Sequence, residues 1–449
     1  MGIKSIPAGW PAVAGRGRMA MRIAAAVMLG VIVWSANAGA GMDEPVTAIG
    51  KPAESSLDVF LGEPRFEKRV IFEEGDHVRE PYLAVALDGT VLAVRNQEGH
   101  MRRSEDGGES WSDILEVPIG FRDTNMIVDD TNGDILSVRM WDGEDTLWRS
   151  TDHGKSWTEE DIVLKPNEVM KWLERTGLKE RSAAEEGATE SQTYFMHGNA
   201  SESGITLRHG KHEGRLLVSA TFRPHAEAHP SDRDPVDAIY SCAIHSDDGG
   251  ATWQVSGFFP EGYTEEAALA ELSDGRIHYN SRSHQGYHAS DLERELTPED
   301  RLRRIAWSDD GGRTWEDREV SSVLPDGGGY DRGYGMKGGL VRLPVKDRDI
   351  LIYSNADTEG GPRERMTVWA SFDGGETWPV KRLVFAEHAA YSSLGAGRPD
   401  TPSEGQIYLL FEGSEAHRYH AMQVARFNLS WLLEGEPTGD GEMPAWVSE

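Results

Sequence analysis

Two residues with the chemistry of a binding or catalytic site, Glu266 and Arg282, stand at the ends of a predicted hairpin. Apolar residues precede the pair Asp274-Gly275 and a second run begins at Ile277, a pattern typical of two strands joined by a tight turn. Glu266 begins the first strand and Arg282 ends the second, so we expect both side chains to project from the same end. An arginine there can bind a carboxylate through paired hydrogen bonds, and a glutamate can act as a base. The alternative is an ordinary ion pair at a sheet edge.

Three other segments hold arginine or tyrosine side chains that strands and turns do not require. Arg79 precedes Pro81 at the start of a predicted strand, and Arg363 and Arg365 precede another. Tyr391 stands among small residues shortly before a further strand. A phenol has a pKa near 10, so it becomes a nucleophile only with a base beside it. The alternatives are solvated loop arginines and a half-buried tyrosine that only packs.

Five copies of the pattern S-x-D-x-G-x-x-W lie along the chain between Arg79 and Tyr391. They span Ser104–Trp111, Ser150–Trp157, Ser246–Trp253, Ser308–Trp315 and Ser371–Trp378. The Asp can accept hydrogen bonds from backbone N–H groups ahead of it, and the Gly permits a positive φ. The hydroxyls can bond further backbone groups, and the Trp offers a large ring for burial. We therefore predict five copies of one hairpin turn, in which the Asp serves the turn and not catalysis.

This repeat resembles the Asp box, or BNR repeat, of the sialidase superfamily. The resemblance implies an all-β fold: a six-bladed β-propeller with five Asp-box turns on the face away from the active site. A blade needs about 40 to 50 residues, so the 96 residues from Asp152 to Asp248 are too many for one plain blade. That gap contains a polar run near 165–192 with apolar residues at helical spacing, which we interpret as an insertion.

The arginine segments also resemble parts of the sialidase site. The resemblance implies that three arginines bind the substrate carboxylate: Arg79, Arg282 and Arg363. Arg363 fits the family spacing better than Arg365. The match at Arg79 departs from the family in one position, because Glu80 replaces an apolar residue.

The resemblance further implies that Tyr391 is the nucleophile and Glu266 its base. Sialic acid carries a carboxylate on its anomeric carbon, where a neutral phenol avoids the repulsion that a charged nucleophile would meet. Sialidases also use an acid/base Asp on a loop that corresponds here to residues 95–103, which contain no Asp. Glu98 is the only carboxylate in that loop and becomes the candidate acid/base, with His100 as the other proton carrier.

Together these features imply a secreted exo-sialidase, a retaining glycoside hydrolase that releases terminal α-linked sialic acid. Its partner would be a sialylated glycan or a related acidic sugar, and we expect no cofactor and no metal. The absent Asp leaves two alternatives open: a hydrolase of another anionic sugar, and a carbohydrate-binding propeller without catalysis. A scaffold whose repeat turns serve stability alone is a third.

Charge and cysteine content exclude other classes of site. Asp and Glu number 76 against 46 Lys and Arg, for a formal net charge of −30, whereas nucleic-acid binding needs a basic surface. Cys242 is the single cysteine, so no internal disulfide can form. His225 and His229 have the i, i+4 spacing of a zinc pair, but Pro224 and Pro230 leave no room for a helix.

The N-terminus has the pattern of an export signal. Basic residues precede an apolar run, Ile23 to Trp34, and an A-x-A site follows, with cleavage after Ala38 or Ala40. The run is shorter than the roughly twenty residues of a membrane span, so we expect no stable membrane insertion and a secreted or periplasmic bacterial protein. We assign 1–40 to the signal, 41–57 to a linker, 58–432 to the propeller and 433–449 to an irregular tail.

Overall fold

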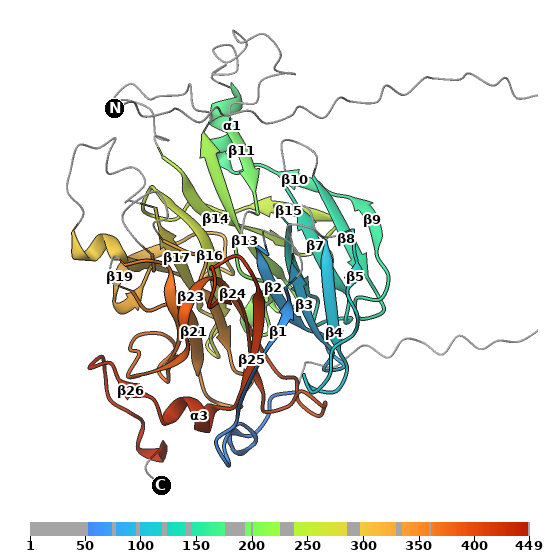
Figure 1. Ribbon diagram of the computed structural model, residues 1–449. Coiled ribbons are helices and arrows are strands. Elements are labelled where there is room, and N and C mark those ends of the chain that lie inside the picture. Colours follow the sequence, from blue (N-terminus) through green and yellow to red (C-terminus); the bar gives the residue numbers. More distant parts are fainter. Residues whose placement is uncertain are drawn as a thin grey trace, which may run out of the picture. The chain divides into compact units, whose positions relative to one another are not determined.

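Short runs of apolar and small residues become strands in the computed structural model (Figure 1), and all their pairings but that of β10 (Val163–Lys165) with β15 (Thr252–Val255) are antiparallel among the strands described. The structure describes residues 53–447 except for 74–77, 96–98, 119–123, 141–144, 176–193, 199–200, 225–237, 285–296, 329–334 and 359–360. Within these ranges strands make up most of the regular structure and the helices are short. The prediction of an all-β fold is confirmed.

Three sheets have four antiparallel strands each, in chain order. The first joins β2 (Pro81–Val85), β3 (Val91–Arg95), β4 (His100–Ser104) and β5 (Leu115–Glu116). The second joins β6 (Thr124–Val128), β7 (Ile135–Arg139), β8 (Thr146–Ser150) and β9 (Thr158–Asp161). The third joins β16 (Thr264–Glu271), β17 (Ile277–Ser283), β18 (Leu302–Ser308) and β19 (Glu316–Pro325). Each sheet is thus a meander of hairpins.

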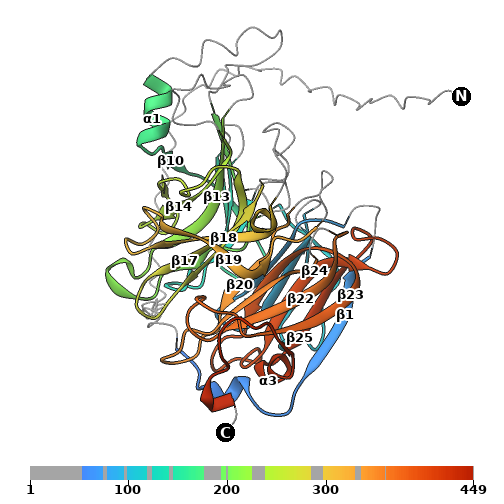
Figure 2. The same cartoon turned by 90° about the vertical axis from the view of Figure 1, so that its left-hand side faces the viewer.

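A six-stranded sheet carries the helix of the predicted insertion. Its path is β10 (Val163–Lys165), β15 (Thr252–Val255), β14 (Tyr240–Ser246), β13 (Leu216–Pro224) and β11 (Tyr194–His197), with β12 (Ile205–Thr206) also on β13. Helix α1 (Glu168–Arg175) follows β10, and the Asn167 side chain accepts a hydrogen bond from Met170 N at 2.9 Å. Met170 and Leu173 pack into the core beside Phe222. Figure 2 shows α1 far from the C-terminal strands, at the edge of the described fold.

The last sheet has eight strands, and it differs from the expectation of six separate blades. It runs β1 (Phe66–Phe72), β25 (Met422–Phe427), β24 (Ile407–Ser414), β23 (Val380–Ala396), β22 (Glu364–Ser371), β21 (Leu351–Ala356) and β20 (Gly339–Arg342), with β26 (Glu436–Pro437) beside β23. The first half of β23 pairs with β22 and its second half with β24. The described strands therefore form five hydrogen-bonded sheets, not six separate ones, because this 17-residue strand is continuous.

The sheets are arranged as in a β-propeller, and their inner strands contact one another in a closed cycle. The contacts run β2 to β6, β6 to β13, β13 to β16, β16 to β20, β20 to β23 and β23 back to β2. Apolar side chains of neighbouring sheets fill the space between them, among them Trp253 and Trp369, both almost without exposure. Strand β1 completes the last sheet by pairing with β25, so segments from both ends of the described chain lie side by side.

The five motif copies form the same hydrogen-bonded turn, each after the third strand of a meander. In the copy at Ser371, the hydroxyl donates to Asp373 Oδ1 at 2.7 Å and accepts from Gly375 N at 2.8 Å. Asp373 in turn accepts from Thr377 N at 2.9 Å and from Thr377 Oγ1 at 2.6 Å. Gly375 has a φ of 100°, the left-handed geometry that favours glycine. The Asp side chains are therefore occupied by their own turns.

Short helices occur between the strands and near the two ends of the described chain. Three-ten helices cover Leu57–Phe60, Gly210–His212, Pro298–Arg301 and Ala445–Val447, and helix α3 covers Leu429–Leu433. Ser55, in the predicted linker, is buried and forms a β-bridge with Val345. The predicted export signal and the His225–His229 pair lie outside the described residues. None of the helices described is long and apolar enough to cross a membrane.

Candidate active site

Four of the sequence-predicted residues converge through strands that are far apart in the chain. Arg79 precedes β2, Glu266 lies near the start of β16, Arg282 near the end of β17, and Tyr391 in the middle of β23. Because β2, β16 and β23 are inner strands of neighbouring sheets, their side chains meet near the centre of the ring. Glu266 and Arg282 do lie at the same end of their hairpin, where Glu265 pairs with Arg282 across the two strands.

Tyr391, Glu266 and Arg282 form the centre of the cluster. The Tyr391 hydroxyl donates to Glu266 Oε1 at 2.5 Å and accepts from Arg282 Nη1 at 3.3 Å. Arg282 Nη1 also forms an ion pair with Glu266 Oε2 at 2.5 Å. All three side chains are at least 90% buried. The arrangement is that of a nucleophile with a base in hydrogen-bond reach and a cation that orients the base.

A β-bulge aims Glu266 at this centre. The pairing of β16 with β17 shifts its register between Glu265 and Ala267, and Glu266 has a φ of 35°, which is unusual for a residue with a side chain. Without the bulge, adjacent residues would point to opposite faces of the strand. Such strain persists where the surrounding structure holds it in place, and it is most common at functional sites.

The environment keeps the Tyr391 phenol neutral. Burial is the largest cause that raises its pKa, followed by the charge of Glu266, whereas Arg282 and Arg363 act in the opposite direction. Burial lowers the pKa of Arg282, but the charges of Glu266 and other neighbours leave it above its ordinary value. The phenol can therefore lose its proton only as a neighbour takes it up, and Glu266 is in contact for that transfer.

Two further arginines flank the Tyr391 ring. The guanidinium carbon of Arg79 lies 4.9 Å from the ring centroid, and that of Arg363 lies 5.3 Å from it. Arg363 donates to Tyr419 Oη at 3.0 Å and to the carbonyl of Gly335 at 2.8 Å. The three predicted arginines thus surround one phenol, a set of donors suited to an anionic ligand.

The remaining predicted residues lie elsewhere or outside the described ranges. Arg365, the alternative to Arg363, is exposed, whereas Arg363 is only 6% exposed. Glu98 lies outside the described residues, so its assignment as acid/base stays a prediction. His100 begins β4, and its Nδ1 is 2.8 Å from Arg95 Nη2. No group of three or more potential metal ligands occurs in the part of the chain that the structure describes.

Curated relatives share most of this chain. A sialidase of Micromonospora viridifaciens is 28% identical over 461 residues, which cover 92% of this chain and 59% of the relative. A sialidase of Bacteroides fragilis is 26% identical over 378 residues, which cover 76% of this chain and 60% of the relative. This chain is therefore similar to sialidases over most of its length, which supports a place in the sialidase superfamily. No family model matches it.

A solved sialidase structure has the same fold. A Hadza microbial sialidase superposes with a TM-score of 0.54 at 21% identity, over 79% of this chain and 66% of the other. At that identity the likeness concerns the fold alone. The chain also spans only about three fifths of the first two curated relatives, 59% and 60% of their lengths.

Sequence reasoning missed the role of Glu412 in this candidate site. Its carboxylate on β24 accepts from Arg79 Nε at 3.2 Å, from Glu80 N at 2.8 Å and from Tyr391 N at 3.2 Å. The side chain has no exposure. The signal for it was a glutamate that ends an apolar strand run, Ile407–Phe411, where a carboxylate would be buried.

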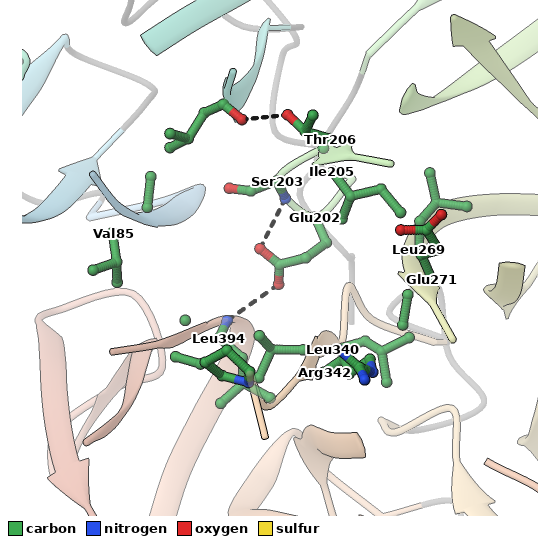
Figure 3. A pocket seen from close by; sticks show the side chains of 18 of the residues that line it. Val85, Glu202, Ser203, Ile205, Thr206, Leu269, Glu271, Leu340, Arg342 and Leu394 are labelled. Atoms are coloured by element: carbon green, nitrogen blue, oxygen red, sulfur yellow. Dashed lines mark hydrogen bonds between the residues drawn. The ribbon is translucent and has the colours of Figure 1, made fainter. Parts of the chain in front are cut away.

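A separate cavity lies further along the inner strands. Its volume is about 160 Å³, and neither Tyr391 nor the three arginines line it. Figure 3 shows Glu202 in its wall, where the carboxylate accepts hydrogen bonds from Ser203 N and Leu394 N. Glu271 lines it too, and burial raises the pKa of Glu271 to about 7, although two backbone N–H groups oppose the shift. The chemistry of the Tyr391 cluster is therefore not located in this cavity.

Proposed function

We propose that this protein is a retaining exo-sialidase that releases terminal α-linked sialic acid from sialylated glycans. One observation carries the proposal: the Tyr391 hydroxyl bonds to Glu266 at 2.5 Å inside a ring of three arginines. Tyrosine nucleophiles are the sialidase exception among glycosidases, and guanidinium groups suit the carboxylate that distinguishes sialic acid. The curated relatives named as sialidases support the same assignment.

In the proposed reaction Tyr391 Oη attacks the anomeric carbon while its proton passes to Glu266. The bond from that carbon to the leaving-group oxygen breaks, and this oxygen takes a proton from an acid, for which the sequence predicts Glu98. Water then cleaves the sugar–tyrosine bond. The acid residue takes a proton from the water, and Glu266 returns its proton to the phenolate, so that two displacements give retention.

The test is turnover of a fluorogenic aryl sialoside by the purified protein, with Tyr391→Phe as the matched variant. We expect activity in the wild type and a fall in kcat of at least about 10³-fold in the variant, because phenylalanine has no nucleophilic oxygen. Binding of the 2,3-dehydro derivative of N-acetylneuraminic acid should persist in both. Absence of turnover by the wild type across a broad pH range would refute the proposal.

A second candidate is a hydrolase of another anionic sugar, or a propeller that binds such a sugar without cleaving it. The sequence departure that favours it is the short segment 95–103, which lacks the expected Asp. Aryl uronides and ulosonic acid glycosides, assayed beside the sialoside, separate the first of these from a sialidase. Binding of sialic acid without hydrolysis of any of them would identify the second.

Two structural and cellular assignments belong to the same proposal. We infer that the eight-stranded sheet acts as two blades joined through β23, which makes the propeller six-bladed and agrees with six inner strands in the contact cycle. We also infer export through the segment that ends at Ala38 or Ala40. N-terminal sequencing of the mature protein from a bacterial periplasm or medium tests the cleavage site.

A further inference from the structure

Glu80 is an additional carboxyl group inside the arginine cluster. Its Oε1 accepts from Arg79 Nη2 at 3.0 Å, and its backbone N–H donates to Glu412 Oε1 at 2.8 Å. The other oxygen, Oε2, is buried and has no hydrogen-bond partner among the residues described. Glu80 also has a φ of 64°, in the left-handed region, directly before Pro81. This backbone conformation is costly for a glutamate, so the surrounding structure must hold it in place.

The charged or titratable groups around Glu80 come from five parts of the fold. Arg79 precedes it on the same segment, Glu412 lies on β24, Glu266 on β16, Lys337 just before β20 and Tyr391 on β23. Arg79 already has a carboxylate partner in Glu412, whose oxygen lies 3.2 Å from Nε. If Glu80 were ionised as well, two negative charges would face this one guanidinium.

Two features favour the neutral form of Glu80. A buried carboxylate oxygen without a donor loses its hydration and gains nothing in return, which disfavours ionisation. Burial raises the pKa of Glu80 to about 7, and the charges of Glu412 and Glu266 add to this, while Arg79 and Lys337 oppose it. Near neutral pH the group therefore exists in both forms.

We infer that Glu80 is a positioning residue that sets how strongly Arg79 binds the carboxylate of a substrate. With Glu80 neutral, Arg79 and Glu412 form a pair without net charge. With Glu80 ionised, the three groups carry one net negative charge, and the anion is held less tightly. This inference rests on the proposed function in one respect, that an anionic sugar binds at the arginines.

In this arrangement, binding of an anion at Arg79 and binding of a proton at Glu80 are coupled. A bound anion stabilises the proton on Glu80, and the proton on Glu80 strengthens anion binding by the same factor. Binding above pH 7 therefore takes up a proton. The dissociation constant for the anion should rise by up to about tenfold per pH unit above the pKa of Glu80, and it should be level below it.

Calorimetry with the 2,3-dehydro derivative of N-acetylneuraminic acid tests this directly. Titrations at pH 7.5 in phosphate and in Tris, whose ionisation heats differ, report the protons taken up per ligand bound. We expect an uptake of between about half and three quarters of a proton, because a group with a pKa of about 7 is about three quarters ionised at pH 7.5. An uptake of zero with clear binding overturns the role of Glu80, whereas absence of binding at every pH counts against the proposed function instead.

The variant Glu80→Gln assigns the proton to its residue. Glutamine keeps an acceptor near Arg79 and cannot ionise, so proton uptake should vanish and affinity at pH 8 should exceed that of the wild type by about tenfold. Glu80→Leu should also abolish the pH dependence, and it replaces Glu80→Gln if the amide variant fails to fold. Glu316→Gln, at an exposed position on β19, is the matched control and should behave as the wild type. Undiminished uptake in a folded Glu80 variant overturns the inference.

Discussion

Arg363 and Arg365 stand two residues apart, yet they have opposite environments. Residues i and i+2 of a regular strand share a face. Here β22 shifts its register between Glu364 and Met366, and Arg365 has a φ of 61°. The bulge sends Arg365 into solvent and leaves Arg363 beside the Tyr391 ring. Only one of these two arginines can therefore contact a ligand bound at the phenol.

This difference predicts a clear contrast between two alanine variants. Arg363→Ala removes a charged donor of the buried cluster, and a hydrogen bond to a charged group contributes about 1.5 to 3 kcal/mol. We expect KM for an aryl sialoside to rise about 10- to 100-fold. Arg365→Ala serves as the matched control and should change KM less than about twofold, as for an exposed side chain. Equal effects of the two substitutions would contradict the placement of Arg363 at the site.

The repeat turns are elements whose structure depends on local hydrogen bonds. Asp373 receives three of them, from the Ser371 hydroxyl and from the backbone and hydroxyl of Thr377. Glu376 lies in the same turn and is exposed. A turn held by its own side chains should influence stability without influencing a site at the start of the inner strands.

Asp373→Ala tests this separation of roles. We expect it to lower the free energy of unfolding by about 1 to 2 kcal/mol, because backbone and hydroxyl donors lose their acceptor. Urea denaturation measures this change, with Glu376→Ala as the control that should leave the midpoint unaltered. Turnover of a sialoside by the folded Asp373→Ala protein should equal that of the wild type. Loss of activity without loss of stability would indicate that the Asp has a chemical role after all.

Elements of this fold could be predicted from the sequence wherever their cause is local. The five turns depend on residues within eight positions of one another, so a repeated pattern was enough to find them. The hairpin that carries Glu266 and Arg282 could also be predicted from the sequence, because an Asp-Gly turn separates its strands. The two bulges that aim Glu266 and Arg363 could not, since a register shift arises from pairing with a neighbouring strand.

At the scale of the whole molecule, prediction from sequence was limited by contacts between distant segments. The continuity of β23 across two strand pairings was hidden, because nothing in its composition marks the change of partner at His388. The role of Glu412 could not be predicted from the sequence for a related reason. Its three donors come from Arg79, Glu80 and Tyr391, and two of these are more than 330 residues away in the chain.

Three buried carboxyl groups should stabilise the folded molecule more in mild acid than at neutral pH. Burial is the main cause that raises the pKa of Glu80 and Glu271 to about 7 and that of Asp326 to about 6. The unfolded chain releases these protons near pH 4, whereas the folded chain holds them until pH 6 to 7. The unfolded state therefore binds fewer protons in this window, and stability falls as pH rises through it. Each group contributes a slope of up to about 1.4 kcal/mol per pH unit.

The carboxylates of the repeat turns act in the opposite direction, because they stabilise the fold less as the pH falls. Hydrogen bonds from Ser110 and Ser156 outweigh partial burial and lower the pKa of Asp106 and Asp152 to about 2, so their stabilisation is lost as pH falls below about 4. The combined contribution of these buried and turn carboxyl groups to stability should therefore be greatest between about pH 4 and 5. Urea unfolding of the wild type and of variants from pH 3 to 8 measures such contributions. Glu271→Gln removes one titrating group far from Tyr391, so its stability relative to the wild type should improve as pH rises from 5 to 7.5. Because both proteins otherwise carry the same acidic surface, the difference between them isolates this carboxyl from general charge repulsion. The exposed Glu319→Gln is the control, and a difference between Glu271→Gln and the wild type that does not vary with pH would show that Glu271 does not titrate in this window.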